Sequence, residues 1–65
     1  MFSYTPLFTL LIQKGMTKTQ LREAVDIGTG TLAKMSKGKY VAMEVLDKIC
    51  IYLQCNIEDV IKHQP

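Results

Sequence analysis

Histidine is almost absent from this 65-residue chain, and His63 stands near its end with no second histidine close by. Paired histidine ligands, and combinations of serine, histidine and aspartate or of cysteine and histidine, therefore have no support in the sequence. A chain of this length also leaves little room for a buried substrate pocket. We predict no catalytic residue, no metal site and no cofactor, and we expect the protein not to be an enzyme.

Cysteine is scarce too. Cys50 and Cys55 are five residues apart, in or just after a helical run, and this separation suits a disulfide poorly. The N-terminal segment MFSYTPLFTLLIQKG lacks the basic region and small-residue cleavage site of a secretory signal. We therefore expect a cytoplasmic protein whose two cysteines stay reduced and pack as small buried hydrophobic residues.

Long hydrophobic runs and strand patterns are also missing. The apolar N-terminal stretch is well short of the roughly 20 residues that cross a bilayer, so it predicts a core helix and no membrane association. No alternation of apolar and polar residues is long enough to predict a strand. The chain is 48% hydrophobic and 22% charged, which is enough for one small core.

Helical patterns account for most of the sequence. We predict one all-α domain over residues 1–65, with helices at about 5–14, 18–25, 29–36, 42–53 and 57–62. The inward-facing residues expected from their spacing are Leu7, Leu10, Leu11, Leu21, Ala24, Val25, Leu32, Met35, Val45, Leu46, Ile49, Cys50, Leu53, Ile57, Val60 and Ile61.

Four of the five predicted helices begin at a residue that can cap them. Thr5 precedes Pro6, Gly28 precedes the third helix, and Asn56 precedes the fifth. The second helix has the strongest start, because Thr17 and Gln20 have the spacing of a capping box. Met16 and Leu21 can also close a hydrophobic staple there.

The segment GTGTLA, residues 28–33, has the glycine spacing of a dinucleotide-binding loop. That loop needs a strand before its first glycine and an acidic residue about 20 positions later. Here the preceding TKTQLREAV is predicted to be helical, and the acids that follow, Glu44 and Asp47, come too early. The segment is better explained as the turn and first coil of a helix.

Charge is distributed unevenly. Between positions 14 and 39 there are six basic residues against two acidic ones, a net of +4, whereas residues 40–65 carry a net of −2. The middle of the chain is therefore the part that would attract a polyanion.

The second and third predicted helices are joined by little more than Asp26 and Ile27, and the apolar Ile27 is expected to turn inward. Two short helices, a tight turn and a basic second helix form a helix-turn-helix pattern. The segment MTKTQLREAVDIGTGTLAKMSKGK resembles the helix-turn-helix core of the lambda-repressor-like, or Xre, family of bacterial and phage regulators. The following VLDKICIYLQCNIEDVI resembles the last two helices of that five-helix domain, so the resemblance covers about residues 4–62 and is nearest to very short members of the family.

The resemblance implies how DNA would be contacted. In that family the third helix enters the major groove, which assigns base contacts to Thr29, Gly30, Ala33 and Lys34. It assigns phosphate contacts to Thr17, Lys18, Gly28, Thr31, Lys37 and Lys39. Gly28 stands where the family often has serine, and Asp26 where it often has glycine. Only Lys34 among the four base-contact positions has the reach for a strong contact, so we expect modest sequence specificity per monomer.

Two functions remain open at this point. The first is a cytoplasmic regulator of transcription that binds double-stranded DNA, most simply as a homodimeric repressor on an inverted repeat. The second is a protein-interaction module on the same fold, with weak or no DNA binding and a protein partner. The small side chains at the base-contact positions favour the second, whereas the clustered lysines favour the first. The fifth and N-terminal helices are the expected dimer contacts.

Overall fold

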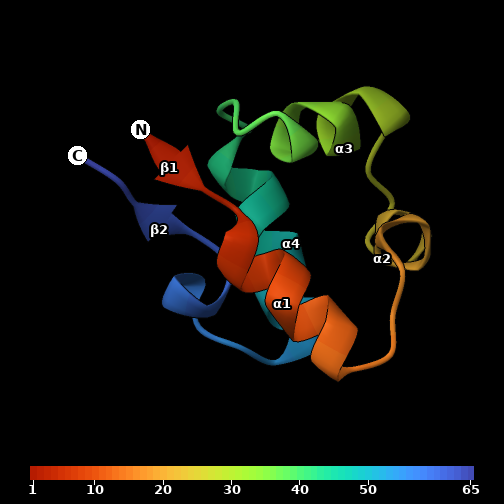
Figure 1. Cartoon of the computed structure of the whole chain (residues 1–65). Coiled ribbons are helices and arrows are strands. Elements are labelled where there is room, and N and C mark those ends of the chain that lie inside the picture. Colours follow the sequence, from red (N-terminus) through yellow and green to blue (C-terminus); the bar gives the residue numbers. More distant parts are fainter.

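The computed structural model describes all residues from 1 to 65, and helices dominate it (Figure 1). The elements, in chain order, are β1 (Phe2–Ser3), α1 (Thr5–Gln13), α2 (Lys18–Ala24), α3 (Thr29–Ser36), α4 (Met43–Leu53), the 3₁₀ turn η1 (Ile57–Asp59) and β2 (Lys62–His63). None of the helices is both long and apolar enough to cross a membrane.

The prediction of a fifth helix is wrong. Residues 57–59 form one 3₁₀ turn, and the following residues extend into β2, which pairs antiparallel with β1 so that Phe2 faces His63. The Met1 carbonyl accepts a hydrogen bond from the Gln64 N–H at 2.8 Å, so the pairing continues to both ends of the chain. A strand of two residues is too short to leave a periodic pattern in the sequence, so this pairing was not predicted.

Helix α2 begins as its sequence predicts. The Gln20 N–H donates to Thr17 Oγ1 at 3.0 Å, and the Thr17 N–H donates to Gln20 Oε1 at 2.8 Å. At α1 the prediction is wrong by one residue, because Thr5 is the first helical residue and Tyr4 is the N-cap. There the Ser3 hydroxyl accepts a hydrogen bond from the Thr5 N–H. This N–H is one of the first of the helix, which have no partner within the helix itself.

The core is a cluster of eleven buried apolar side chains drawn from every helix. Its members are Tyr4, Leu7, Leu11, Leu21, Val25, Ile27, Met35, Leu46, Ile49, Leu53 and Val60. Three expected core residues differ, because Ala24 is exposed, Ile57 is 40% exposed and Leu32 is half-buried outside the cluster. Cys50 and Cys55 are half-buried and pack against the cluster. Short helices in a small domain leave their edge positions near solvent.

Val60 connects the C-terminal segment to α1. Its side chain is fully buried, and its carbonyl accepts a hydrogen bond from the Leu7 N–H at 3.3 Å. The first N–H groups of a helix have no partner within the helix. The residue after η1 therefore satisfies one of them and closes the chain onto α1, as the proximity of the two termini in Figure 1 illustrates.

Tyr4 joins the start of α1 to the segment that follows α3. Its ring is buried, and its hydroxyl donates to the Lys39 carbonyl at 2.8 Å. Burial raises the pKa of the Tyr4 phenol, and a hydrogen bond with the Val41 backbone partly opposes this shift. The phenol therefore ties this segment to the core, and Val41 also packs its side chain against the core cluster.

Replacement of the capping residue tests the start of α2. We expect Thr17→Ala to lower the free energy of unfolding by about 0.5–2 kcal/mol, because Thr17 accepts the Gln20 N–H. Thr19→Ala is the matched control, since Thr19 is exposed in the same turn, and its effect should stay within about 0.5 kcal/mol. Urea unfolding followed by circular dichroism measures both. Equal losses in the two variants would contradict the assigned cap.

Replacement of the buried phenol tests the tie between α1 and residue 39. We expect Tyr4→Phe to lower the free energy of unfolding at neutral pH by about 1 kcal/mol, because the Lys39 carbonyl loses its donor. Folding raises the pKa of this phenol. Its contribution to the free energy of unfolding is therefore complete below the unfolded pKa near 10.0 and is lost as the pH rises through the folded pKa.

The difference between wild type and Tyr4→Phe should therefore shrink above about pH 10 in urea titrations at several pH values. Tyr52→Phe is the control, because Tyr52 is half exposed and its loss should have little effect at any pH. A difference that stays constant across this range would show that the phenol proton makes no contribution.

Candidate nucleic-acid interface

Helices α2 and α3 are held together by the turn between them. Asp26 has φ 55°, in the left-handed region, and the next residue, Ile27, turns its side chain into the core as predicted. The Ile27 N–H donates to the Arg22 carbonyl at 3.1 Å, which ends α2. Aspartate is one of the few residues other than glycine that adopts this conformation at modest cost, which explains how Asp26 occupies a position where glycine is common.

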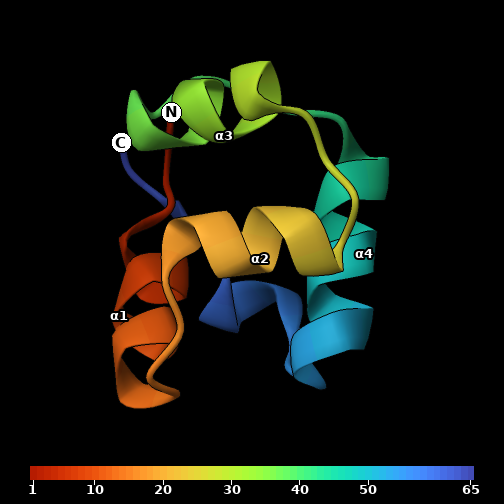
Figure 2. The ribbon, with the colours of Figure 1, turned by 90° about the vertical axis from the view of Figure 1, so that its right-hand side faces the viewer.

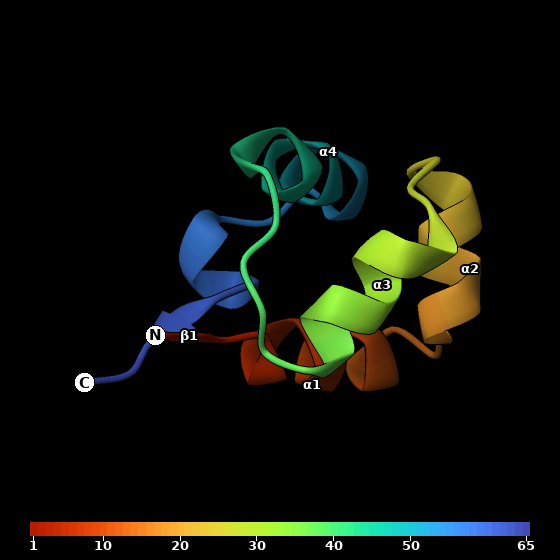
Figure 3. The ribbon, with the colours of Figure 1, turned by 90° about the horizontal axis from the view of Figure 1, so that it is seen from above.

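Helix α3 lies along one outer side of the molecule. Figure 2 shows it above α2, and Figure 3, seen from above, shows it in front of α1 and α2. Met35 is the one buried residue of this helix. The side of α3 opposite Met35 is therefore open to solvent.

All four predicted base-contact residues are on that open side. Thr29, Gly30, Ala33 and Lys34 are exposed, and the spacing of an α-helix puts them within one connected strip of surface. We call this strip, defined by these four residues, the α3 outer face. It carries one hydroxyl and one basic side chain, which are groups of the kind that can hydrogen-bond to base edges.

The amino end of α3 presents unpaired backbone donors. Gly28 is its N-cap with no side-chain hydrogen bond, and the first N–H to reach a partner inside the helix is that of Leu32, which donates to the Gly28 carbonyl at 3.2 Å. The N–H groups of Thr29, Gly30 and Thr31 precede it, and such groups with the helix dipole attract an anion. The predicted phosphate contacts Gly28 and Thr31 thus lie at the end of α3 that an anion would favour.

Gly30 has open space where a side chain would be. A Cβ built on it would meet no atom within 4 Å. Close packing between α2 and α3 therefore does not require a glycine at this position. The backbone of the α3 outer face is therefore accessible from outside at this residue.

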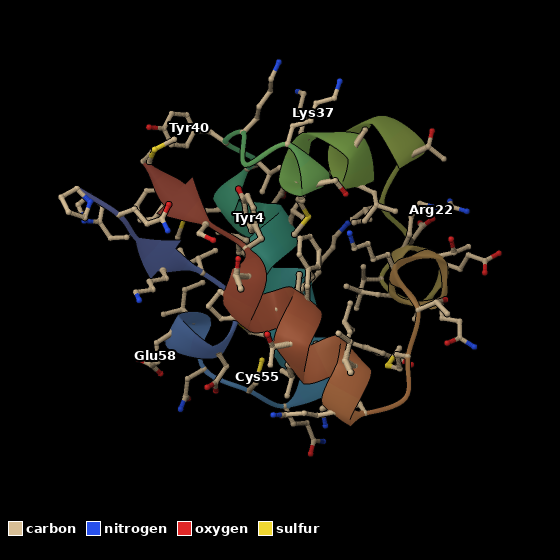
Figure 4. All side chains as sticks on the ribbon, in the orientation of Figure 1. Tyr4, Arg22, Lys37, Tyr40, Cys55 and Glu58 are labelled. Atoms are coloured by element: carbon tan, nitrogen blue, oxygen red, sulfur yellow. The ribbon has the colours of Figure 1, made fainter.

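The basic residues after α3 are fixed by their backbone. Lys37 is the C-cap, Gly38 takes φ 70°, and the Lys39 N–H returns to the Lys34 carbonyl at 2.9 Å. Both lysine side chains are exposed. Figure 4 shows Lys37 and Tyr40 on the side of α3, far from Glu58 and Cys55 at the opposite end of the molecule.

Lys18 and Thr17 lie at the start of α2. The Lys18 ammonium is 4.0 Å from the centre of the Phe8 ring, a cation–π distance that connects α2 to α1. The Thr17 hydroxyl accepts the Gln20 N–H, and its own hydrogen remains available to donate. These contacts hold both predicted phosphate-contact residues at the amino end of a helix.

Two residues that support the interface were not identified as such from the sequence. The Tyr4 hydroxyl donates to the Lys39 carbonyl, and the Phe8 ring lies against the Lys18 ammonium. Their chemical type gave no signal for these partners, because each contact joins elements distant in the chain. No group of three or more potential metal-ligating side chains exists in the structure.

Comparison with known proteins identifies the family. The model of the Cro/C1-type helix-turn-helix DNA-binding domain matches residues 7–65. The crystal structure of the transcriptional regulator VanUg, form II, superimposes with a TM-score of 0.96 at 44% sequence identity, covering 98% of this chain and 85% of the other. A search of curated proteins found no match.

The match extends over nearly the whole chain and includes the helix-turn-helix formed by α2 and α3. The resemblance inferred from the sequence is therefore confirmed. This protein belongs to the family of Cro/C1-type helix-turn-helix DNA-binding domains.

Proposed function

We propose that the protein regulates transcription by inserting α3 into the major groove of double-stranded DNA. The observation that carries the proposal is the α3 outer face, whose four residues are exposed together while Met35 anchors the opposite side in the core. The major groove is wide enough to admit a helix. The likeness to VanUg, a transcriptional regulator by its name, supports regulation as the purpose.

The four residues of the α3 outer face would divide the recognition between them. Lys34 has the reach to donate to O6 and N7 of guanine, while Thr29 and Ala33 offer contacts to thymine methyl groups. Gly30 contributes its backbone, which lies open to a close approach. With one long polar side chain, each subunit would distinguish few base pairs.

The six phosphate-contact residues would supply most of the affinity. Lys18, Lys37 and Lys39 add positive charge on either side of α3, and Thr17, Gly28 and Thr31 add donors at the starts of α2 and α3. Neutralised phosphates release bound counterions, so binding would weaken steeply with added salt.

Two copies acting together would compensate for the small recognition surface. A homodimer would place two α3 helices in successive major grooves, about one helical turn apart on an inverted repeat. Occupation of a promoter by such a dimer would exclude polymerase, so repression is the simplest outcome. The expected contacts are α1 and the segment around η1.

A protein-interaction module is the second candidate. An apolar groove of about 410 Å³ runs between α4 and η1, with Met43 71% exposed and Ile57 40% exposed at its edge. Exposed apolar patches with polar rims mark interaction sites in many proteins. This groove would bind a protein partner whether or not α3 binds DNA.

Fluorescence anisotropy tests the two candidates. The labelled duplex comes from upstream of the gene of this protein, with a scrambled duplex beside it, at about 50 and 200 mM salt. We expect salt-sensitive binding that prefers the upstream duplex. Folded protein that binds neither duplex would refute the regulator and leave the interaction module.

Lys34 is the most informative single change. Lys34→Ala should weaken binding to the upstream duplex by about 1–3 kcal/mol, roughly 5- to 150-fold, with a smaller effect on the scrambled duplex. Lys48→Ala is the control, because Lys48 is an exposed lysine of α4 outside the proposed interface, and its affinity should stay near wild type. An equal loss for both duplexes would mean that Lys34 contacts phosphate and not a base.

Replacement of Gly30 is expected to change stability and DNA binding in opposite directions. Gly30→Ala should raise the free energy of unfolding by up to about 1 kcal/mol, because alanine favours a helix and the added methyl meets no atom of the protein. The same methyl should weaken DNA binding, because it would occupy the space through which DNA approaches the backbone of α3. Ser36→Ala, at the exposed far end of α3, should change stability slightly and leave affinity unaltered. A Gly30→Ala protein that binds as tightly as wild type would contradict the approach of DNA at this residue.

A further inference from the structure

The two cysteines lie together at the end of α4. Gln54 takes φ 51°, in the left-handed region, and its N–H returns to the Ile51 carbonyl at 3.4 Å. The Cys55 N–H returns to the Cys50 carbonyl at 3.1 Å. This pair of bonds is a Schellman motif, in which the residue after the left-handed position characteristically packs its side chain on the residue five positions earlier.

The motif therefore explains why a five-residue separation brings two thiols together. In a continuing helix, residues five apart point to different sides, which is the basis on which the sequence made a disulfide improbable. The left-handed Gln54 reverses the chain, and the 3.1 Å bond holds the backbone of Cys55 against that of Cys50. A disulfide needs Cα atoms about 4.4–6.8 Å apart, a separation that a backbone contact of this type provides.

Both thiols are accessible from the same side. They are half-buried, and both line the apolar groove between α4 and η1 together with Met43, Leu46 and Ile57. Neither takes part in the α3 outer face, and Figure 4 shows Cys55 at the opposite end of the molecule from Lys37. A small reagent can thus reach the cysteines without approaching the proposed DNA surface.

The two thiols have different environments. Burial raises the pKa of the Cys55 thiol, and the neighbouring Cys50 raises it further; Asp59 acts in the same direction and Lys14 against it. A raised pKa lowers the thiolate fraction of Cys55, so its attack is expected to be the slower step of an exchange.

We propose that Cys50 and Cys55 form a thiol–disulfide site that a small disulfide oxidises reversibly. In the first step the Cys50 thiolate attacks one sulfur of the oxidant, forming a mixed disulfide and releasing one thiolate. In the second step Cys55 loses its proton to solvent and attacks the Cys50 sulfur, forming the Cys50–Cys55 bond and releasing the second thiolate. Two protein thiols are oxidised, and one disulfide is reduced to two thiols.

The closed bond would fix the end of α4 and one wall of the apolar groove. It would connect the last turn of the helix covalently to the residue that leads into η1. The site would thus respond to thiol redox state at the face where the groove lies, while α3 stays unmodified. It does not depend on the proposed DNA binding.

Oxidised glutathione at about 1 mM, added to the folded wild-type protein, provides the test. Intact mass spectrometry after acid quenching should show the loss of two hydrogen atoms, and peptide mapping without reductant should show Cys50 linked to Cys55. The intramolecular form should exceed the glutathione adduct by more than about tenfold, because the fixed geometry gives a higher effective concentration than glutathione in solution. Dithiothreitol should restore the reduced mass.

Cys50→Ser and Cys55→Ser are the matched variants, and each should accumulate only the glutathione adduct. The wild-type peptide map alone decides the matter if either variant fails to fold. The proposal is overturned if the wild-type protein stays reduced, carries mainly glutathione, links only to a second copy, or closes the bond only after denaturation. Because the readout is mass and not DNA affinity, the result is independent of the regulator proposal.

Discussion

The burial of Met35 is the contact on which the proposed interface depends most. Helix α3 has only eight residues and buries this one side chain, so its attachment to the rest of the molecule rests on a small area. Two further contacts hold α3 in place. Ile27 is buried just before the helix, and the Tyr4 hydroxyl donates to the Lys39 carbonyl just after it. Because Met35 alone is buried, the side of α3 opposite to it stays available for the proposed contact with DNA.

The rest of the fold forms the hydrophobic core against which Met35 packs. Eleven buried apolar side chains form one cluster, and Val60 brings the C-terminal segment against the first turn of α1. The pairing of β1 with β2 then joins the chain ends. In a domain this small, where the core is limited, such connections between distant segments reduce the number of elements that can detach independently.

The outer surfaces are divided by chemistry. The α3 side carries the exposed Lys34, Lys37 and Lys39, and the α4–η1 side carries an apolar groove with two thiols at its wall. Because the faces are separated by the core, a modification or partner on one need not block the other. This separation makes DNA binding, partner binding and thiol chemistry compatible in one chain, although they remain distinct proposals.

Local physical chemistry made much of the helical structure predictable. The Thr17–Gln20 capping box, the turn with Ile27 inward and the bounds of α3 each follow from residues close together in sequence, and the structure confirms them. The helix-turn-helix family could be inferred for the same reason. The sequence-based error at residues 57–62 arose because the apolar spacing of Ile57, Val60 and Ile61 suits a helix, whereas pairing with β1 draws the segment into an extended conformation.

The sequence by itself determined the four α-helices, their order and the residue types of the α3 outer face. Only the tertiary structure decided that the Lys18 ammonium lies on the Phe8 ring, that the Lys39 carbonyl accepts from Tyr4, and that Gly30 has empty space above it. It also decided that Cys50 and Cys55 meet. The reason is common to all of these: helix starts and turns are set by interactions among neighbouring residues, whereas exposure and side-chain partners depend on segments that meet only after the chain has folded.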